Sequence, residues 1–260
     1  MAEKKPVIFK PALLVVDMQE DFCPPNGSLA VAGGRDIVAA INHLLKLPFA
    51  LKVATKDWHK PDHVSFAVNH PLPDTNTTPS SYATNNGTST PQSHPKQTKQ
   101  PFVDTCIIRH PDDPSQSYET RLWPVHCVQD SPGAQLIPEL DHQSIHMVHQ
   151  KGTDSRVEMY SAFYDPLRVY DSKLADVLRM RGITHVYVVG LAADYCVKFT
   201  ALDSQAEGFT TYIIDECTEA VDPDYWETQG KAEVQAAGVK IISVTGPEVK
   251  RVVDDSGNTE

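Results

Sequence analysis

Residues 186–196 of the chain read VYVVGLAADYC, and they begin with a continuous apolar run rich in valine. Such a run is typical of a strand that is buried on both faces of a parallel sheet. Five other runs of this kind occur in the chain, at 12–16, 51–54, 145–148, 211–214 and 240–244. The six runs predict about six strands, most of them parallel.

Helical patterns lie between these predicted strands. The stretches with helical spacing or helical composition are 37–45, 174–178, 196–207 and 225–237. Asp171 or Ser172 is expected to cap the second of them, and Gly182 to end it. Alternating strands and helices predict right-handed βαβ units. The expected fold is a doubly wound α/β domain with helices on both faces of a mostly parallel sheet.

The composition excludes several classes of protein. Apolar residues make up 40% of the 260 residues, which is enough for a sizeable core. The 34 acidic residues exceed the 23 basic ones and leave a net charge of −11. Nucleic-acid binding needs clustered basic residues, so we expect no nucleic-acid partner. No apolar run approaches the roughly 20 residues that span a bilayer, so we expect no membrane partner.

The five cysteines and the N-terminal residues bear on the cellular compartment. The cysteines are scattered without a CxxC spacing, which does not suit a disulfide framework in a chain of this length. The N-terminal residues lack the apolar core of a signal peptide. We therefore expect a cytoplasmic protein, and the sequence leaves nuclear or peroxisomal presence open.

One segment departs from the alternating pattern. From about residue 69 to 101, Thr, Ser, Pro, Asn and Gln dominate and few apolar anchors occur. Such a segment cannot bury enough surface to offset the entropy of ordering it. We interpret it as an exposed, mobile insertion within a single domain that spans residues 1–260. A regulatory or partner-binding loop is the alternative.

Reactive side chains follow four of the predicted strands. Asp17 comes directly after the first strand, Asp57 and His59 after the second, Lys151 after the third, and Cys196 after the run that begins at 186. In open α/β sheets, ligands bind at the carboxyl ends of the strands. The sequence therefore predicts a functional site at this edge of the sheet.

Cys196 stands at the expected start of a helix. The helix dipole and the unpaired N–H groups there favour a thiolate, and the same groups can hold an oxyanion. Asp17 could accept the thiol proton and return it to a leaving amine, while Lys151 would keep Asp17 ionised and lower the pKa of the thiol. A purely structural cysteine is the alternative, but the neighbouring Asp17 and Lys151 favour a nucleophile.

A second pattern suggests a metal site. Asp57 and His59 are two residues apart, so they share one face if the strand continues that far. His126 could supply a third ligand and leave positions open for water or substrate. A D-x-H pair alone is more often a hydrogen-bonded surface pair. His63 is a further candidate, either as a ligand or as a group that supports one.

Six short stretches together carry a resemblance to a known family. They are LVVDMQEDFC at 14–23, TKDWH at 55–59, DHVSF at 62–66, LWPVHCV at 122–128, KGTD at 151–154, and VGLAADYCV at 189–197. In these stretches the chain resembles the nicotinamidases, which are members of the isochorismatase-like cysteine hydrolases. The stretches occur in family order over nearly the whole chain, and the insertion resembles that of fungal members.

The resemblance implies a catalytic triad of Asp17, Lys151 and Cys196, and one divalent metal ion on Asp57, His59 and His126. Zinc is the expected ion, with iron or manganese as alternatives. The resemblance also implies an oxyanion hole formed by the N–H groups of Ala192 and Cys196, and a cis peptide between Leu191 and Ala192. The positions that match ring-binding positions of the family are Phe22, Trp123, Leu191, Ala192 and Tyr195.

The implied activity is hydrolysis of nicotinamide to nicotinate and ammonia through a cysteine thioester, a step of NAD salvage. We also expect a homo-oligomer. Two other functions stay open. One is hydrolysis of another amide or an N-carbamoyl compound, against which the intact metal triple argues. The other is an inert metal-binding or interaction module, against which the intact Asp17, Lys151 and Cys196 argue.

Overall fold

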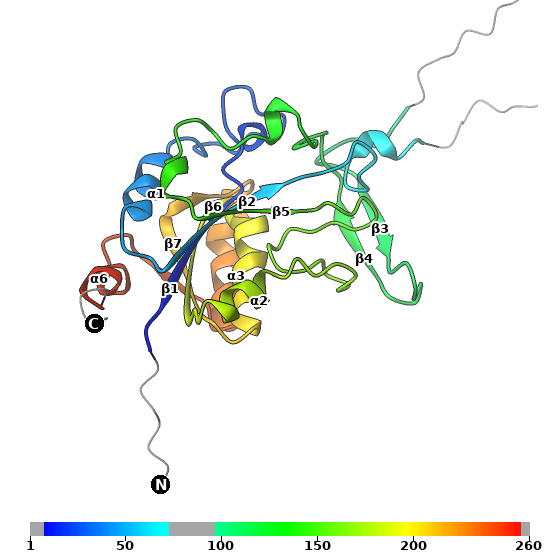
Figure 1. The fold of residues 1–260 in the computed structure, drawn as a ribbon. Coiled ribbons are helices and arrows are strands. Elements are labelled where there is room, and N and C mark those ends of the chain that lie inside the picture. The colour runs from blue at the N-terminus through cyan, green and yellow to red at the C-terminus, as the bar shows by residue number, and fades with distance from the viewer. Residues whose placement is uncertain (1–7, 73–96, 256–260) are drawn as a thin grey trace, which may run out of the picture.

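A computed structural model describes residues 8–72 and 97–255 of the chain (Figure 1). Its centre is a sheet of six strands in the order β5-β2-β1-β6-β7-β8, and every neighbouring pair is parallel. The strands are β1 Pro11–Val16, β2 Leu51–Asp57, β5 Met147–Lys151, β6 His185–Leu191, β7 Thr210–Glu219 and β8 Lys240–Ile242. The predicted α/β fold with a parallel sheet is confirmed.

Several strand boundaries differ from the predicted ones, and β2, β6 and β7 extend past the predicted ends to Asp57, Leu191 and Glu219. The third strand begins at Met147 instead of 145, because a 3-10 turn at His142–Ser144 occupies the residues before it. The last strand ends at Ile242 instead of 244. There the Glu216 carboxylate accepts hydrogen bonds from the Ser243 hydroxyl at 2.6 Å and the Val244 amide at 2.9 Å, which turns the chain away from the sheet.

Helices cover both faces of the sheet. They are α1 Val38–Leu45, α2 Leu174–Met180, α3 Lys198–Ala206, α4 Pro223–Tyr225, α5 Lys231–Ala236 and α6 Pro247–Asp254. A π-helical turn at Ala193–Val197 precedes α3, and another at Trp226–Gly230 precedes α5. The remaining 3-10 turns are Glu20–Phe22, Ala67–Asn69 and Pro132–Ala134.

The start of α2 differs from the prediction. Its N-cap is Lys173, in the left-handed conformation, and neither Asp171 nor Ser172 holds that position. The two predicted residues still bind the turn before the helix: the Asp171 carboxylate accepts from the Lys173 amide at 2.8 Å, and the Ser172 hydroxyl accepts from the Leu174 amide at 3.2 Å. Gly182 follows the helix with a φ of +67°, a conformation that favours glycine at a helix end.

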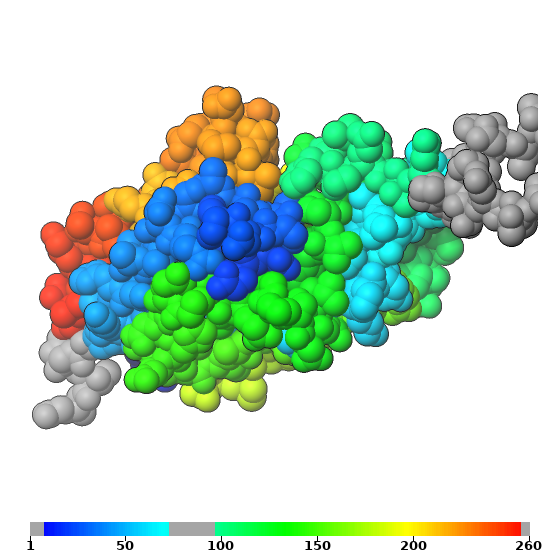
Figure 2. Space-filling model, turned by 90° about the horizontal axis from the view of Figure 1, so that it is seen from above, coloured from blue at the N-terminus to red at the C-terminus, as the bar shows by residue number. Residues whose placement is uncertain are grey.

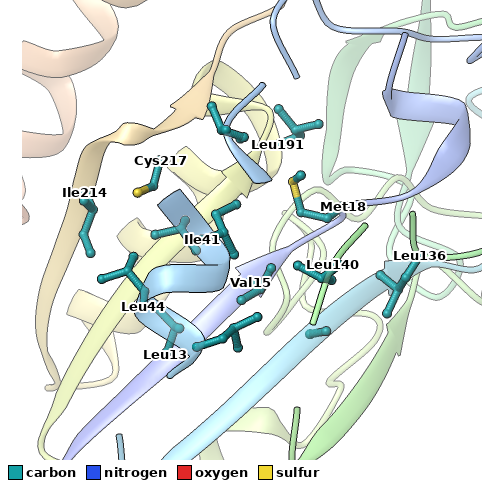
Figure 3. Close-up of a cluster of buried hydrophobic side chains, with 14 of the residues drawn as sticks. Leu13, Val15, Met18, Ile41, Leu44, Leu136, Leu140, Leu191, Ile214 and Cys217 are labelled. Atoms are coloured by element: carbon teal, nitrogen blue, oxygen red, sulfur yellow. The ribbon is translucent and has the colours of Figure 1, made fainter. Parts of the chain in front are cut away.

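Strand β1 shows why its sequence is continuously apolar. Leu13 and Val15 point into a core with α1 and α6, which Figure 3 shows in close-up. Ala12, Leu14 and Val16 belong to a second core with α2, α3 and α5. Since successive side chains of a strand point to opposite faces, a strand between two helical layers is apolar at every position.

A two-stranded antiparallel hairpin lies outside the main sheet. It consists of β3 Thr105–Arg109 and β4 Ser117–Arg121, and it packs on its own small apolar cluster. Figures 1 and 2 show it at one end of the molecule, next to residues 60–72 and far from α6. No apolar run in the sequence predicted this hairpin.

The ends of the insertion lie close together. The Leu72 amide donates a hydrogen bond to the Gln97 carbonyl at 2.8 Å, and Pro71 and Thr98 form an antiparallel bridge. Of the segment at about 69–101 that was predicted to be a mobile insertion, residues 73–96 lie outside the described residues. Within the described part of the chain, no helix is both long enough and apolar enough to cross a membrane.

Candidate active site

The carboxyl edge of the sheet brings together the reactive residues of four strands. Asp17 follows β1 directly, Asp57 and Lys151 are the paired last residues of β2 and β5, and Cys196 lies five residues after β6. Because the strands are parallel, their carboxyl ends meet at one edge. We refer to Asp17, Lys151 and Cys196 below as the triad.

Lys151 lies at the centre of this cluster. Its Nζ is 2.9 Å from Asp17 Oδ2 and 3.5 Å from Cys196 Sγ, and it also donates to Asp57 Oδ1. The side chain is fully buried. Burial opposes its charge, but the carboxylates of Asp17 and Asp57 outweigh this and raise the pKa of Lys151 well above its ordinary value. Lys151 is therefore an ammonium group that holds both carboxylates in place.

Asp17 is oriented by a neighbouring strand. The Thr55 hydroxyl donates to Asp17 Oδ1 at 2.6 Å and accepts from the Asp17 amide at 3.1 Å. Burial raises the pKa of the Asp17 carboxyl, with Lys151 opposing the shift. One carboxylate oxygen of Asp17 lies within 4.8 Å of Cys196 Sγ. A carboxyl group that binds a proton more readily than usual, this close to a thiol, is suited to proton transfer.

Cys196 lies in the π-helical turn before α3 and is 6% exposed. Burial raises the pKa of its thiol well above the ordinary value, and the charge of Lys151 only partly opposes this. The lowered pKa expected from the sequence is thus wrong, because burial outweighs the nearby ammonium group. A thiol that keeps its proton needs a base to become a nucleophile, and Asp17 lies where such a base is needed.

Asp57, His59 and His126 form a second group, which we call the ligand cluster. Asp57 Oδ2 is 3.3 Å from His59 Nε2 and 4.0 Å from His126 Nε2. Strand β2 ends at Asp57, before His59. The side chains of Asp57 and His59 therefore do not share a strand face, as they would if the strand continued to His59. The His59 amide instead donates to the Cys127 carbonyl at 3.0 Å, which places His59 and His126 on adjoining segments.

The ring orientation of each histidine is fixed by its other nitrogen. His59 Nδ1 lies 2.9 Å from the Gly152 carbonyl, and His126 Nδ1 lies 2.8 Å from the Pro124 carbonyl. These contacts leave Nε2 as the free acceptor of both rings. Gly152 has a φ of +66°, and a Cβ there would lie 2.4 Å from His59 Cε1. The glycine therefore allows His59 its position.

The ligand cluster fits a divalent metal ion. His59 Nε2 is buried and has no hydrogen-bond partner, which is costly for a polar atom unless it binds something else. Burial lowers the pKa of His126 to about 4, so its imidazole stays neutral, the form that binds metals. Lys151 outweighs the opposing effect of burial and holds the pKa of Asp57 well below its usual range, so Asp57 is an anion.

His63 lies beside this cluster, 3.9 Å from His59 between ring centroids. Its Nδ1 is 2.8 Å from the Ser65 hydroxyl, and its Nε2 is buried without a hydrogen-bond partner. One nitrogen each of His59 and His63 and one carboxylate oxygen of Glu158 lie within 4.8 Å of one another. His63 is therefore close enough to serve either as a ligand or as a support for one.

A cleft of about 400 Å³, counted with its open mouth, leads to Cys196 and the ligand cluster. Its walls are mostly aromatic and aliphatic, formed by Phe22, Leu29, Val31, Trp123, Glu158, Tyr160, Ala192, Tyr195 and Val221. Of the predicted ring-binding residues, only Leu191 is missing from the lining of this cleft. Leu191 is 1% exposed and belongs to the core, where Figure 3 shows its side chain.

The turn that carries Cys196 begins with the predicted cis peptide between Leu191 and Ala192. The Ala192 carbonyl accepts hydrogen bonds from the amides of Tyr195 and Val197, at 3.0 and 3.1 Å, and this closes a tight turn around Cys196. Ala192 and Cys196 both line the cleft, so an oxyanion held by their amides would face it.

Sequence reasoning missed several residues of the site. The Gln19 amide group donates to the Asp57 carbonyl and accepts from the Asp57 amide, both at 2.8 Å. Thr55 orients Asp17, and Glu158 lies in the cleft wall. Gln19 and Thr55 stand within the quoted stretches, so position alone could have marked them. Glu158 lies in an irregular loop that carries no pattern.

The chain is similar to a known family and to several of its members. A model of the isochorismatase domain matches residues 11–246. A nicotinamidase of Acinetobacter baylyi is 37% identical over 89% of this chain and 92% of its own length. The structure of the yeast nicotinamidase bound to the inhibitor nicotinaldehyde has a TM-score of 0.75 at 29% identity, covering 90% of this chain and 99% of that chain.

A pyrazinamidase of Pyrococcus horikoshii, solved in complex with zinc, has a TM-score of 0.62 at 29% identity, and the match covers 90% of this chain and 99% of that chain. These similarities extend over nearly the whole length of both partners. The chain is a member of the isochorismatase family.

Proposed function

We propose that the chain hydrolyses nicotinamide to nicotinate and ammonia. The observation that carries the proposal is the convergence of the triad, whose Cys196 lines an aromatic cleft, beside the ligand cluster. The thiol and carboxyl groups suit attack on an amide carbon, and the flat aromatic walls suit a planar ring. The nicotinamidase relatives support the same substrate.

In the first half of the proposed reaction, Cys196 Sγ attacks the carboxamide carbon while Asp17 takes the thiol proton. The C–N bond then breaks, and Asp17 gives the proton to the leaving ammonia. The product is a thioester between the nicotinoyl group and Cys196. The amides of Ala192 and Cys196 would hold the negative charge that develops on the carbonyl oxygen.

In the second half, Asp17 takes a proton from a water molecule, which attacks the thioester carbon. The C–S bond breaks, the sulfur recovers the proton from Asp17, and nicotinic acid leaves and releases its carboxyl proton to water as nicotinate. Lys151 stays charged throughout and stabilises negative charge on Asp17 and on the sulfur. Asp17 thus acts as base and as acid in turn, which suits its raised pKa.

We propose zinc as the ion of the ligand cluster, with His63 as a candidate fourth ligand. Two imidazoles and a carboxylate are an ordinary donor set for zinc, although iron and manganese also accept it. The zinc-bound pyrazinamidase supports this choice. A bound ion would act as a Lewis acid toward the ring nitrogen. Phe22, Trp123 and Tyr195 would enclose the ring, whose carboxamide would then face Cys196.

We also propose a domain organisation, a cellular compartment and an oligomeric state. The chain forms a single domain, with the segment at about 69–101 as an insertion, and it acts in the cytoplasm as a homo-oligomer. Light scattering of the purified protein would measure the oligomeric state. A monomer at working concentration would contradict the proposed homo-oligomer.

Ammonia release from nicotinamide by the purified protein tests the function, before and after removal of metal with a chelator. We expect turnover of nicotinamide, a raised KM after chelation, and recovery when zinc is added. An N-carbamoyl amino acid serves as the competing substrate. Preferential hydrolysis of that compound would favour a different hydrolase of the superfamily, and no ammonia from either substrate would favour an inert module.

A further inference from the structure

Hydrogen bonds connect the side of the cleft formed by Trp123 and Tyr160 to the β3–β4 hairpin. The indole N–H of Trp123 donates a hydrogen bond to the Tyr160 hydroxyl at 2.9 Å. The same hydroxyl lies 3.0 Å from the hydroxyl of Thr120, a residue of β4 that is 5% exposed. Trp123 and Tyr160 both line the cleft, whereas Thr120 does not touch it.

The direction of the Trp123 hydrogen bond follows from the chemistry of the groups. An indole nitrogen can only donate, so the Tyr160 oxygen must accept from Trp123. Either hydroxyl can donate in the contact between Tyr160 and Thr120. Burial raises the pKa of Tyr160 well above its ordinary value, so the phenol keeps its proton. In both arrangements the hydrogen bond to Thr120 holds the Tyr160 hydroxyl where it can accept from the indole.

A second side chain of β4 holds the same segment of chain. The Tyr118 hydroxyl donates to the Glu158 carbonyl at 3.1 Å and accepts from the Glu158 amide, also at 3.1 Å. Tyr118 and Thr120 are two residues apart on a strand, so they share one face. That face of β4 therefore contacts Glu158 and Tyr160, two residues of the cleft wall.

Trp123 is 3% exposed, and its other contacts are apolar packing in the core, the Arg121 guanidinium 5.8 Å from its ring centroid, and two aromatic rings. Tyr195 meets it edge to face at a centroid distance of 5.0 Å, and Phe102, which is 46% exposed, does so at 5.8 Å. Ring contacts of this kind restrict a plane less than a hydrogen bond at 2.9 Å does. The hydrogen bond to Tyr160 is therefore the directional contact that fixes the indole plane.

We propose that Thr120 is a positioning residue, which acts through Tyr160 to hold Trp123 as a wall for the aromatic ring of the substrate. The proposal rests on the proposed function for its substrate. It assigns to the hairpin a role in ring binding that is separate from the thiol chemistry at the sheet edge.

The test replaces Thr120 with valine, which has the same shape and no hydroxyl, and with serine, which keeps the hydroxyl. Thr105→Val is the matched control, because Thr105 is an exposed threonine of the same hairpin. We expect Thr120→Val to raise KM for nicotinamide about five- to tenfold, with kcat and the rate of Cys196 alkylation within about twofold of the unchanged protein. Serine should restore KM, and Thr105→Val should leave it unchanged.

A KM for Thr120→Val within about twofold of the unchanged protein would overturn the proposal, and so would an equal rise in Thr105→Val. A fall in kcat with no change in KM would overturn it as well. If the valine variant does not fold, Thr120→Ala is measured in its place under the same criteria.

A second readout does not depend on activity. The indole N–H resonance of Trp123, assigned by its loss in Trp123→Phe, should shift and exchange faster with solvent in Thr120→Val and not in Thr105→Val. An unchanged resonance would overturn the proposal. If the unchanged protein does not hydrolyse nicotinamide, the proposed function fails, while this measurement still decides the role of Thr120.

Discussion

The carboxyl edge of the parallel sheet and the β3–β4 hairpin serve the same cleft in different ways. The sheet edge carries Asp17 and Lys151, which are fully buried, and Cys196, which is nearly so. The hairpin lies outside the sheet, and the residues of β3 alternate between exposed and buried. It contacts the cleft wall through Tyr118, Thr120 and Arg121.

The sheet edge therefore holds the groups that react with the substrate, whereas the hairpin supports the wall that binds its ring. Groups that exchange a proton must be held within hydrogen-bond reach, and strands packed on both faces provide that rigidity. A ring wall tolerates small displacements, so a peripheral element can supply it. We therefore expect changes at the sheet edge to abolish turnover, and changes at the hairpin to alter substrate affinity.

The largest expected effect is that of Cys196→Ala. It removes the nucleophile with little change in volume, so kcat should fall by more than about a thousandfold while the protein still folds. Cys217→Ala is the matched control, because Cys217 is also buried but belongs to the core. The assay is nicotinate formation, with thermal unfolding to verify folding. Near-normal turnover by Cys196→Ala would show that Cys196 is not the nucleophile.

The next effect concerns the metal. His126→Ala removes one ligand, so metal affinity should fall by more than the roughly 10- to 100-fold that is typical of losing a group that only supports a ligand, and KM for nicotinamide should rise. Alkylation of Cys196 by a small electrophile should continue at its normal rate. Elemental analysis of the variant measures the bound metal, with His142→Ala as an exposed control. Full metal retention in His126→Ala would point to His63 as a working ligand instead.

Thr55→Val tests how firmly the sheet edge orients its base. The variant loses the hydroxyl that donates to Asp17 at 2.6 Å, so the carboxylate is held less firmly. We expect kcat to fall about tenfold with KM nearly unchanged, because the loss affects proton transfer and not ring binding. Thr55→Ser should recover most of the rate. A rise in KM with no change in kcat would show that the sheet edge also affects substrate binding, which the account assigns to the hairpin.

The smallest expected effect is that of replacing residues 73–96 with a short Gly/Ser linker. The flanking residues Leu72 and Gln97 are already joined by a hydrogen bond of 2.8 Å, so a short linker can connect them. Loop closure also depends only weakly on length. We expect kcat/KM to stay within about twofold. Loss of folding, measured by thermal unfolding, would show that the replaced segment supports the hairpin or a partner subunit.

The sheet was predictable from the sequence because its strands are apolar on both faces. The run at 12–16 carries this signal without interruption, the run at 51–54 is broken only by Lys52, and the residues that follow them become the site. The rule that ligands bind at the carboxyl ends of parallel strands therefore predicted that Asp17, Asp57, Lys151 and Cys196 lie together. The same rule could not place His126, which follows none of the strands of the main sheet and was a candidate by residue type alone.

The hairpin was not predictable, for physical reasons. Its strands have five residues each, and β4 reads SYETR with only Thr120 buried. No long apolar run marks such a strand, and its stability comes from packing with distant residues such as Val157. The pKa of Cys196 could not be read from the sequence either, since the burial that raises it arises only in the folded chain.

The most direct test of the account is to identify the residue that carries the acyl group during turnover. The enzyme is mixed with nicotinamide, quenched in acid within one turnover, and digested for peptide mass mapping. We predict a nicotinoyl group on the peptide that contains Cys196, and none on this peptide in Cys196→Ala. A nicotinoyl group on another side chain, or its absence from Cys196 at every quench time while nicotinate forms, would contradict the account.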